Sequence, residues 1–279
     1  MENVKINGPK IWFVTGSSRG FGRVWTEAAL QRGDKVAATA RNIDSIADFK
    51  DKYGDNVLIL PLDVTNGEQV QKAVKAAHEY FGRLDVVINN AGYSLVGTVE
   101  EAKADDILAM YKTNVLGPVS VIQAVLPIMR AQGFGHILGT SSSLGHYTVP
   151  LIGYYCSSKW AFEAIYESLA VEVKSFGIHV SIIEPGAYAT EFGSENSLQF
   201  SENLPEYEAV RNMVFENMGK MQRGNPDATA KAVLQLVDTK NPPLRMFLGS
   251  HNLEEIRQVY SDRIKVWEAW QDVAVAAQG

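Results

Sequence analysis

The chain has 279 residues, of which 46% are hydrophobic and 21% are charged, and its formal net charge is −6. This composition is ordinary for a folded globular protein and excludes a disordered or fibrous chain. The length suits one large domain with a well-filled core. Because the acidic balance offers no basic surface to a nucleic-acid backbone, we expect no nucleic-acid partner.

Cysteine, histidine and apolar segments exclude further classes of protein. Cys156 is the single cysteine, which is typical of a chain without disulfides in a reducing compartment. The five histidines show no ligand-like spacing with each other or with Cys156, so no metal site is predicted. The first residues lack the pattern of a signal peptide, and no uninterrupted apolar segment approaches the length of a membrane span. We therefore expect a cytoplasmic protein without a membrane partner.

Strand and helix patterns alternate along most of the chain. Short apolar runs predict strands at residues 10–15, 35–40, 57–60, 83–88, 136–140, 178–183 and 244–248. Helical periodicity predicts a helix that ends at Gly33, and further helices over 67–81, 105–130, 154–176, 206–221, 227–237 and 253–277. Since the strands are apolar on both faces, the pattern predicts an α/β fold with a doubly wound parallel sheet. Ligands bind such sheets beyond the carboxyl ends of the strands.

Three segments depart from a regular alternation. Gly117-Pro118 falls inside the helix predicted over 105–130 and indicates a kink or local break. Residues 191–224 form a long polar segment with an amphipathic piece, which predicts either a mobile lid rich in methionine or an ordinary packed helix. The helix over 253–277 extends the domain, and no linker or repeat in the sequence marks a second one. The whole chain, residues 1–279, is therefore expected to be a single domain.

A glycine-rich turn lies between the first predicted strand and the first predicted helix. Its glycines have the spacing G-x-x-x-G-x-G, and glycines in such a turn let the backbone approach a pyrophosphate at the helix N-terminus. The strand before the turn and the helix after it are the context that this signal requires. The turn therefore predicts a dinucleotide site with the candidate residues Gly16, Ser18, Arg19, Gly20, Phe21 and Gly22.

Arg41 indicates which dinucleotide binds. It follows the second predicted strand, about where an NAD-specific site carries an acidic residue. Together with Arg19, it could hold the 2′-phosphate of NADP through charge-assisted hydrogen bonds. The alternative is that both arginines are solvated on the surface. The pair favours NADP as the cofactor, with NAD less favoured.

Tyr155 and Lys159 lie four positions apart in the helix predicted over 154–176, so they share one helix face. A free tyrosine has a pKa near ~10 and is a poor base at neutral pH, but a nearby ammonium group favours the phenolate. The pair is therefore suited to proton transfer, although a Tyr-x-x-x-Lys spacing is also common by chance.

Several motifs occur together in one order. They are TGSSRGFG at 15–22, Asp63-Val64, NNAG at 89–92, Asn114, Ser142, YCSSK at 155–159 and PGAYAT at 185–190. With these motifs, the chain from Lys10 to Thr190 resembles the classical short-chain dehydrogenase/reductase family. The resemblance implies a Rossmann-like fold and hydride transfer with a nicotinamide dinucleotide.

The resemblance also implies roles for single residues. Ser142 lies thirteen residues before Tyr155 and matches the catalytic serine of the family, and Lys159 would also bind the nicotinamide ribose. Asn114 would help to hold a water that connects Lys159 to solvent. The resemblance implies further cofactor contacts. Asp63 and Val64 would lie at the adenine, and Asn90, Ala91 and Gly92 beside the adenosine. Pro185, Gly186 and Thr190 would also contact the cofactor, and Thr190 would bind the carboxamide.

These residues predict an NADP-preferring oxidoreductase that interconverts a ketone or aldehyde with an alcohol, with reduction favoured in cells. Tyr155 would be the general acid in reduction and the general base in oxidation. Two alternatives share the fold, namely a redox sensor that binds the dinucleotide without turnover and an epimerase or dehydratase of nucleotide sugars. The sensors usually lose the catalytic residues, and the sugar enzymes usually have a different glycine spacing.

The side chains expected to line the substrate pocket are mostly apolar or aromatic and lie beside the catalytic motifs. They are Tyr93, Ser94, Leu95, Leu144, His146, Tyr147, Val149, Tyr188 and Phe192. This lining predicts a hydrophobic small-molecule substrate. Since the C-terminal helix could cover a contact surface between subunits, monomer, dimer and tetramer all stay open.

Overall fold

The computed structural model describes residues 8–193 and 197–279, so the expectation of no signal peptide concerns residues that lie largely outside the described part. A seven-stranded parallel sheet forms the centre of the fold, with the strand order β3-β2-β1-β4-β6-β7-β9. Its strands are β1 (Ile11–Val14), β2 (Lys35–Ala40), β3 (Val57–Pro61), β4 (Val86–Asn89), β6 (Gly135–Thr140), β7 (Ile178–Pro185) and β9 (Arg245–Leu248). The order reverses direction at β1, as in a doubly wound sheet.

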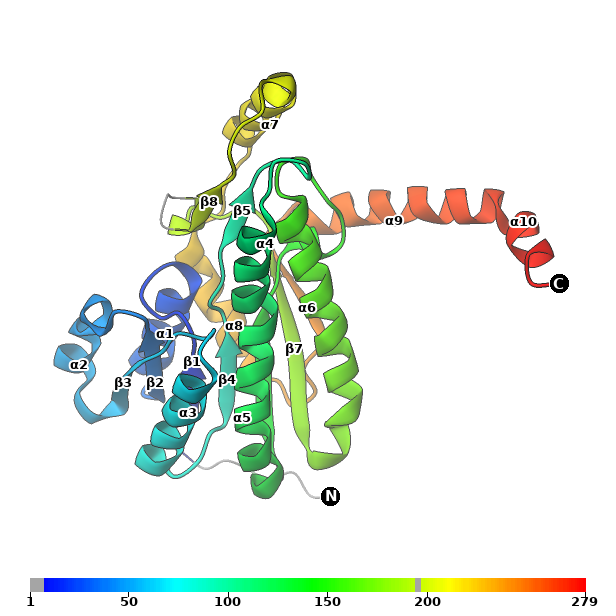
Figure 1. Cartoon of the computed structure of the whole chain (residues 1–279). Coiled ribbons are helices and arrows are strands. Elements are labelled where there is room, and N and C mark those ends of the chain that lie inside the picture. The colour runs from blue at the N-terminus through cyan, green and yellow to red at the C-terminus, as the bar shows by residue number, and fades with distance from the viewer. Residues whose placement is uncertain (1–7, 194–196) are drawn as a thin grey trace.

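Helices cover both faces of this sheet (Figure 1). One core cluster joins Phe13 of β1 to α3 (Gly67–Phe81), α5 (Gly117–Gln132) and α6 (Gly153–Glu172). The other joins Trp12 of β1 to α1 (Gly20–Gln31), α2 (Asp48–Tyr53) and α8 (Thr229–Asp238). Neighbouring residues of a strand face opposite sides of the sheet. Because helices cover both sides, Trp12 and Phe13 are both apolar. The predicted fold is confirmed, with α2 as an element that the sequence did not predict.

The helix predicted over 105–130 is interrupted before Gly117. It consists of α4 (Ala104–Tyr111), a π-helical turn at Lys112–Leu116, and α5. The turn contains Asn114, and π-helical turns are frequent at functional sites. Pro118 lies in the first turn of α5, where its missing N–H costs no hydrogen bond.

The same stretch corrects one expectation about membrane spans. By length and composition, Ala104–Gln132 is long and apolar enough to cross a membrane. Among residues 8–193 and 197–279, one helical stretch has this property. Half of its apolar window is buried inside the fold, and Val121 and Val125 of α5 belong to the core. Its apolar character is thereby explained by packing against the sheet.

A smaller layer of structure lies beyond one end of the large sheet (Figure 1). Strand β5 (Ser94–Val96) pairs in parallel with β8 (Leu198–Phe200), and α7 (Glu208–Lys220) follows. Glu101 anchors this segment, since its carboxylate accepts hydrogen bonds from the Leu204 amide at 2.7 Å and from Arg211 at 2.6 Å. Part of the lid predicted at 191–224, residues 194–196, lies outside the described residues.

The C-terminal extension projects from the body of the molecule (Figure 1). It forms two helices, α9 (Asn252–Ala269) and α10 (Gln271–Ala276), where the sequence predicted one. Asn252 anchors α9, because its side-chain amide donates to the Leu248 carbonyl of β9 at 2.8 Å. Farther out, Trp267 and Trp270 are 61% and 62% exposed, so the end of the extension makes little contact with the body.

Candidate active site

The glycine-rich turn joins β1 to α1 and has a backbone that only glycine fits. Gly16 and Gly20 have φ angles of +72° and +52°, in the left-handed region that favours glycine. A Cβ atom on Gly22 would lie 2.2 Å from the Gly16 carbonyl oxygen. Glycine at position 22 therefore lets α1 begin directly against the turn.

The turn holds an anionic group in this structure. The Gly20 amide donates a hydrogen bond of 3.0 Å to the Glu191 carboxylate, and Gly20 also lies against Thr190. Arg19 is the N-cap residue of α1, with Ser18 just before it. Because amides at a helix N-terminus favour negative charge, the turn fits the pyrophosphate of a dinucleotide. Phe21, the second residue of α1, stacks on Trp25 at 5.2 Å between ring centroids.

The NNAG segment after β4 fastens this turn. The Asn90 side-chain amide donates to the carbonyls of Thr15 and Gly16, each at 3.2 Å. In return, the Thr15 hydroxyl accepts from the backbone amides of Asn90 at 2.9 Å and Ala91 at 3.1 Å. The ends of β1 and β4 are thereby held together beside the turn. Gly92 follows, where a Cβ atom would lie 3.1 Å from the Asn114 side-chain oxygen.

The residues predicted at the adenosine end lie after β2 and β3. Arg41 directly follows β2 and is exposed. The Asp63 carboxylate accepts from the Thr65 amide at 2.9 Å and hydroxyl at 2.7 Å, so it shapes its own loop. Val64 is buried beside Gly117. A Cβ atom added to Gly117 would lie 2.8 Å from a methyl carbon of Val64. Asp63 and Val64 thus form a packed wall at this end.

Ser142, Tyr155 and Lys159 come together at the end of β6. Burial raises the pKa of the Tyr155 phenol, and the neighbouring Ser142 hydroxyl acts in the opposite direction. The Lys159 nitrogen lies 5.6 Å from the centroid of the Tyr155 ring and donates to the Thr140 carbonyl at 2.8 Å. Burial lowers the pKa of Lys159 to about 8, while the Glu163 charge opposes this shift. The three side chains therefore form one buried group that can exchange protons.

Asn114 joins this group through the π-helical turn. Its side-chain nitrogen donates to the Tyr93 carbonyl at 2.8 Å and to the Ser158 hydroxyl at 3.2 Å. Its side-chain oxygen accepts from the Tyr93 amide at 3.1 Å. Asn114 thus fixes the chain after β4 against the helix that carries Tyr155 and Lys159. Its role in holding a water stays a prediction.

Some of the predicted pocket residues surround Tyr155. Tyr93, Leu95 and Leu144 pack with it in one apolar cluster. The Phe192 ring lies 5.5 Å from the Tyr155 ring, between centroids, and covers it from the segment after β7. These side chains make the surroundings of the phenol apolar.

The chain matches a family of known proteins. Residues 10–199 match the family model described as short chain dehydrogenase. The chain belongs to the short-chain dehydrogenase/reductase family. The matched range contains the glycine-rich turn, the NNAG segment, Ser142, Tyr155 and Lys159, so the geometry above is that of an oxidoreductase of this family.

Two curated relatives match most of the chain. Oxidoreductase BOA17 of Botryotinia fuckeliana is 40% identical over 272 residues, which cover 96% of this chain and 99% of the relative. The 3-ketodihydrosphingosine reductase of Bacteroides thetaiotaomicron is 33% identical over 247 residues, covering 86% of this chain and 88% of the relative.

Solved structures agree with this assignment. A short-chain dehydrogenase from Streptomyces avermitilis superposes with a TM-score of 0.90 at 34% identity, covering 97% of this chain and 99% of that chain. An alcohol dehydrogenase from Thermococcus sibiricus, solved with 5-hydroxy-NADP, has a TM-score of 0.71 at 28% identity, covering 86% and 96%. The C-terminal extension thus largely has a counterpart in the first of these structures.

Four other predicted pocket residues have defined contacts of their own. His146 faces a buried cluster behind the loop, where its Nε2 lies 3.1 Å from the Glu184 carboxylate. The Tyr147 hydroxyl donates to Glu255 of α9 at 2.9 Å. Tyr188 packs edge-on against Phe21 of α1, and Ser94 is buried within β5. The polar atoms of His146 and Tyr147 are thereby used in fixing the loop.

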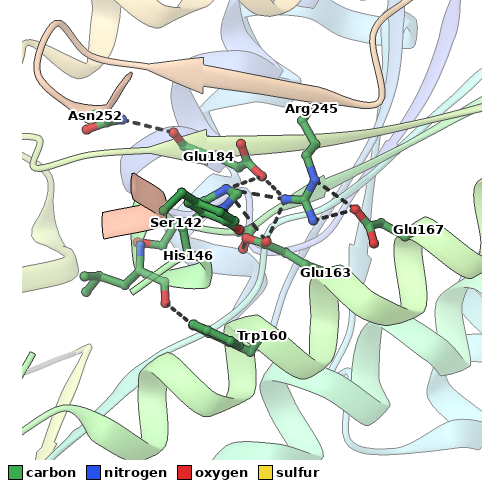
Figure 2. Close-up of polar contacts among 11 residues, drawn as sticks. Ser142, His146, Trp160, Glu163, Glu167, Glu184, Arg245 and Asn252 are labelled. Atoms are coloured by element: carbon green, nitrogen blue, oxygen red, sulfur yellow. Dashed lines mark hydrogen bonds and ion pairs between the residues drawn. The ribbon is translucent and has the colours of Figure 1, made fainter. Parts of the chain in front are cut away.

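Three residues near the site were not predicted, namely Glu163, Glu184 and Arg245. Figure 2 shows that their side chains meet behind the loop of Ser142 and His146. His146, Glu163 and Glu184 offer ligand atoms within 4.8 Å of one another, but the Arg245 guanidinium supplies a cation there, 2.7 Å from Glu163. Helical spacing from Lys159 could have indicated Glu163. No local pattern joins Glu163 to Arg245, which lies 82 positions farther along the chain.

The remaining predicted cofactor residues lie at the end of β7. Pro185 ends the strand, and the Gly186 amide donates to the Leu248 carbonyl of β9 at 2.9 Å. A Cβ atom on Gly186 would lie 2.3 Å from the Asn252 side-chain oxygen, so glycine lets the start of α9 pack here. The Thr190 hydroxyl accepts from the Phe192 amide at 3.3 Å. Contact of Thr190 with a carboxamide stays a prediction.

Proposed function

We propose that this protein is an NADP-preferring carbonyl reductase that converts a hydrophobic ketone or aldehyde to an alcohol. The observation that carries the proposal is the buried group of Ser142, Tyr155 and Lys159 within a family of oxidoreductases. A redox sensor has no need of this complete set. A nucleotide-sugar epimerase or dehydratase is less well supported, because the matched family model is that of the dehydrogenases.

The protein supplies the proton and the orientation for this reaction. The bound dinucleotide supplies the hydride. Burial raises the pKa of Tyr155 and so keeps its hydroxyl protonated at neutral pH, ready to donate to the carbonyl oxygen of the substrate. The Ser142 hydroxyl donates a second hydrogen bond to that oxygen and orients it. Lys159 stabilises the phenolate that forms when Tyr155 has given up its proton.

Two arginines support the preference for NADP. Arg41 follows β2 and Arg19 begins α1, and β1 and β2 are neighbours in the sheet. Both residues therefore lie at the same carboxyl edge, beside the expected adenosine ribose. No acidic residue occupies the position after β2 that would bind the ribose of NAD. Similar solved structures hold either an NADP-type cofactor or NAD, so the proposed preference rests on the two arginines.

The apolar lining supports a hydrophobic substrate. Phe192, Tyr93 and Leu144 surround Tyr155, so water is largely excluded from the phenol. A curated relative carries the name 3-ketodihydrosphingosine reductase, which describes the reduction of a keto group. We therefore propose a ketone with an extended apolar part as the preferred kind of substrate.

The test is a screen of NADPH consumption, followed by absorbance, over ketones and aldehydes graded by size and apolar character. The proposal expects turnover to increase with the apolar part of the substrate, and NADH to give lower kcat/KM than NADPH for the same carbonyl. Tight binding of NADPH without turnover of any carbonyl would instead favour the redox sensor. Isomerisation of a nucleotide sugar without net NADPH consumption would favour the epimerase.

A further inference from the structure

A buried cluster of charged side chains lies behind the active-site loop (Figure 2). Arg245 of β9 donates to Glu163 of α6 at 2.7 Å and also to Glu184 of β7. The two carboxylates are 3% and 0% exposed. A buried carboxylate needs a partner charge, because removing an unpaired ion from water is costly. Arg245 is the shared cationic partner of both carboxylates, and burial together with the neighbouring Glu184 charge raises the pKa of Glu163.

Glu163 also fixes the loop that carries Ser142. The Ser141 hydroxyl donates to one Glu163 oxygen at 2.5 Å. On the other side of Ser142, a Cβ atom on Gly145 would lie 1.8 Å from the same oxygen, so the loop closes directly onto the carboxylate. One buried side chain thus contacts the loop on both sides of Ser142.

The same carboxylate acts on the two residues that move the proton. Glu163 lies one helical turn after Lys159 on α6, and both are buried. Burial lowers the pKa of Lys159 and the Glu163 charge raises it. Burial raises the pKa of Tyr155, and the Glu163 charge adds to this increase. Neutralising Glu163 would therefore lower the pKa of both groups.

We propose that Glu163, held by Arg245, is a positioning residue for carbonyl reduction: it fixes the Ser142 loop and places a carboxylate beside Tyr155 and Lys159. This inference rests on the proposed function. It gives the buried cluster a role in the reaction beyond packing. Titratable and charged groups surround Glu163 on several sides. On α6 they are Tyr155, Lys159 and Glu167, and on the other elements they are His146 of the loop, Glu184 of β7 and Arg245 of β9. Tyr260 of α9 contacts this group through His146.

The test compares Glu163→Gln with Glu167→Gln in the full-length protein. Glu167 pairs with the same arginine, at 2.9 Å, but its side chain is 53% exposed. We expect Glu163→Gln to reduce kcat for carbonyl reduction about 10- to 100-fold, because the loop loses its fixed position. The KM for NADPH should change less than about twofold, since the glycine-rich turn is untouched.

The pH profile separates this role from simple structural support. Reduction requires a protonated Tyr155, so kcat falls at high pH as the Tyr155–Lys159 pair loses its proton. In Glu163→Gln both groups lose a charge that raises their pKa, so this alkaline decline should move to lower pH. In Glu167→Gln both kcat and the profile should match the wild-type enzyme. A Glu163→Gln enzyme with wild-type kcat and an unmoved alkaline decline would overturn the inference.

Two smaller changes keep the test decisive where Glu163→Gln does not fold. Ser141→Ala removes only the hydrogen bond to Glu163, so kcat should fall while the alkaline decline stays in place. Arg245→Lys keeps the charge and should retain more of kcat than Arg245→Met. Unchanged kcat in both Ser141→Ala and Arg245→Met would also overturn the inference. A wild-type protein that reduces no carbonyl would refute the proposed function instead.

Discussion

The backbone amide of Gly20 donates a hydrogen bond of 3.0 Å to the Glu191 carboxylate, so an acidic side chain occupies the N-terminus of α1. This is the place where the turn fits a pyrophosphate. The contact joins the nucleotide site to the segment that leads from β7 toward α7. Binding of a dinucleotide would therefore require this carboxylate to move.

Glu191→Gln should strengthen NADPH binding. A charge at a helix N-terminus is worth about 0.3–1 kcal/mol, so its loss from the competing side chain should lower Kd roughly 2- to 5-fold. Isothermal titration of both proteins with NADPH measures the change. Glu206→Gln, an exposed change of equal charge in the same segment, is the control and should leave Kd unchanged. Weaker binding by Glu191→Gln would mean that Glu191 supports the cofactor.

Arg41→Ala should reduce the affinity for NADPH more than that for NADH. A hydrogen bond to a charged group is worth about 1.5–3 kcal/mol, which corresponds to roughly a 10- to 100-fold increase in the Kd of NADPH. The Kd of NADH should change little, because NADH lacks the 2′-phosphate. Titration with both cofactors gives the ratio, and equal losses would remove the phosphate argument for Arg41.

Tyr155→Phe should remove the proton donor while keeping the apolar ring. General acid catalysis contributes roughly 10²–10⁴-fold, so kcat for carbonyl reduction should fall by that factor with little change in NADPH affinity. Tyr154→Phe is the matched control, because the neighbouring hydroxyl bonds the Val99 carbonyl at 3.0 Å, away from Ser142. Near wild-type turnover in Tyr155→Phe would show that another group donates the proton.

Gly22→Ala should disrupt the nucleotide site through packing alone. The new Cβ would lie 2.2 Å from the Gly16 carbonyl and 2.4 Å from the Asn90 side-chain nitrogen, so α1 must shift away from the turn. Such overpacking costs about 1–3 kcal/mol, visible as a lower Tm and weaker NADPH binding. Gly67→Ala, where no atom lies within 4 Å of the new Cβ, should leave both unchanged.

Glu101→Gln should loosen the segment that carries α7. Burial alone would raise the pKa of Glu101, but hydrogen bonds from the Thr98 and Leu204 amides and from Arg211 lower it to about 2. The ionised carboxylate is thus the form that anchors the segment at neutral pH. Loss of its charge should speed hydrogen exchange in residues 205–220 on the order of 10-fold, with β1 unaffected. Glu216 forms an exposed ion pair with Lys220, so Glu216→Gln is the control. It should leave hydrogen exchange in residues 205–220 unchanged, apart from the helical turn that contains Glu216.

The alternation of strands and helices, the glycine-rich turn and the shared helix face of Tyr155 and Lys159 could be predicted from the amino-acid sequence. Each of these depends on residues close together in the chain, where the periods of strands and helices set which side chains share a face. By resemblance to the family, the spacing of thirteen residues before Tyr155 also indicated Ser142. The break before Gly117 was predicted to within a turn, although it is a π-helical turn containing Asn114.

The contacts between distant segments became visible in the folded structure and could not be predicted from the sequence. The pairing of β5 with β8, the contact of Gly20 with Glu191 and the cluster of Glu163 with Arg245 each join residues more than 80 positions apart. Periodicity carries no information on such pairs, because it records which face a side chain takes and not what faces it. The contact of His146 with Glu184 is of the same kind. The two residues are 38 positions apart, and the His146 Nε2 lies 3.1 Å from the buried carboxylate.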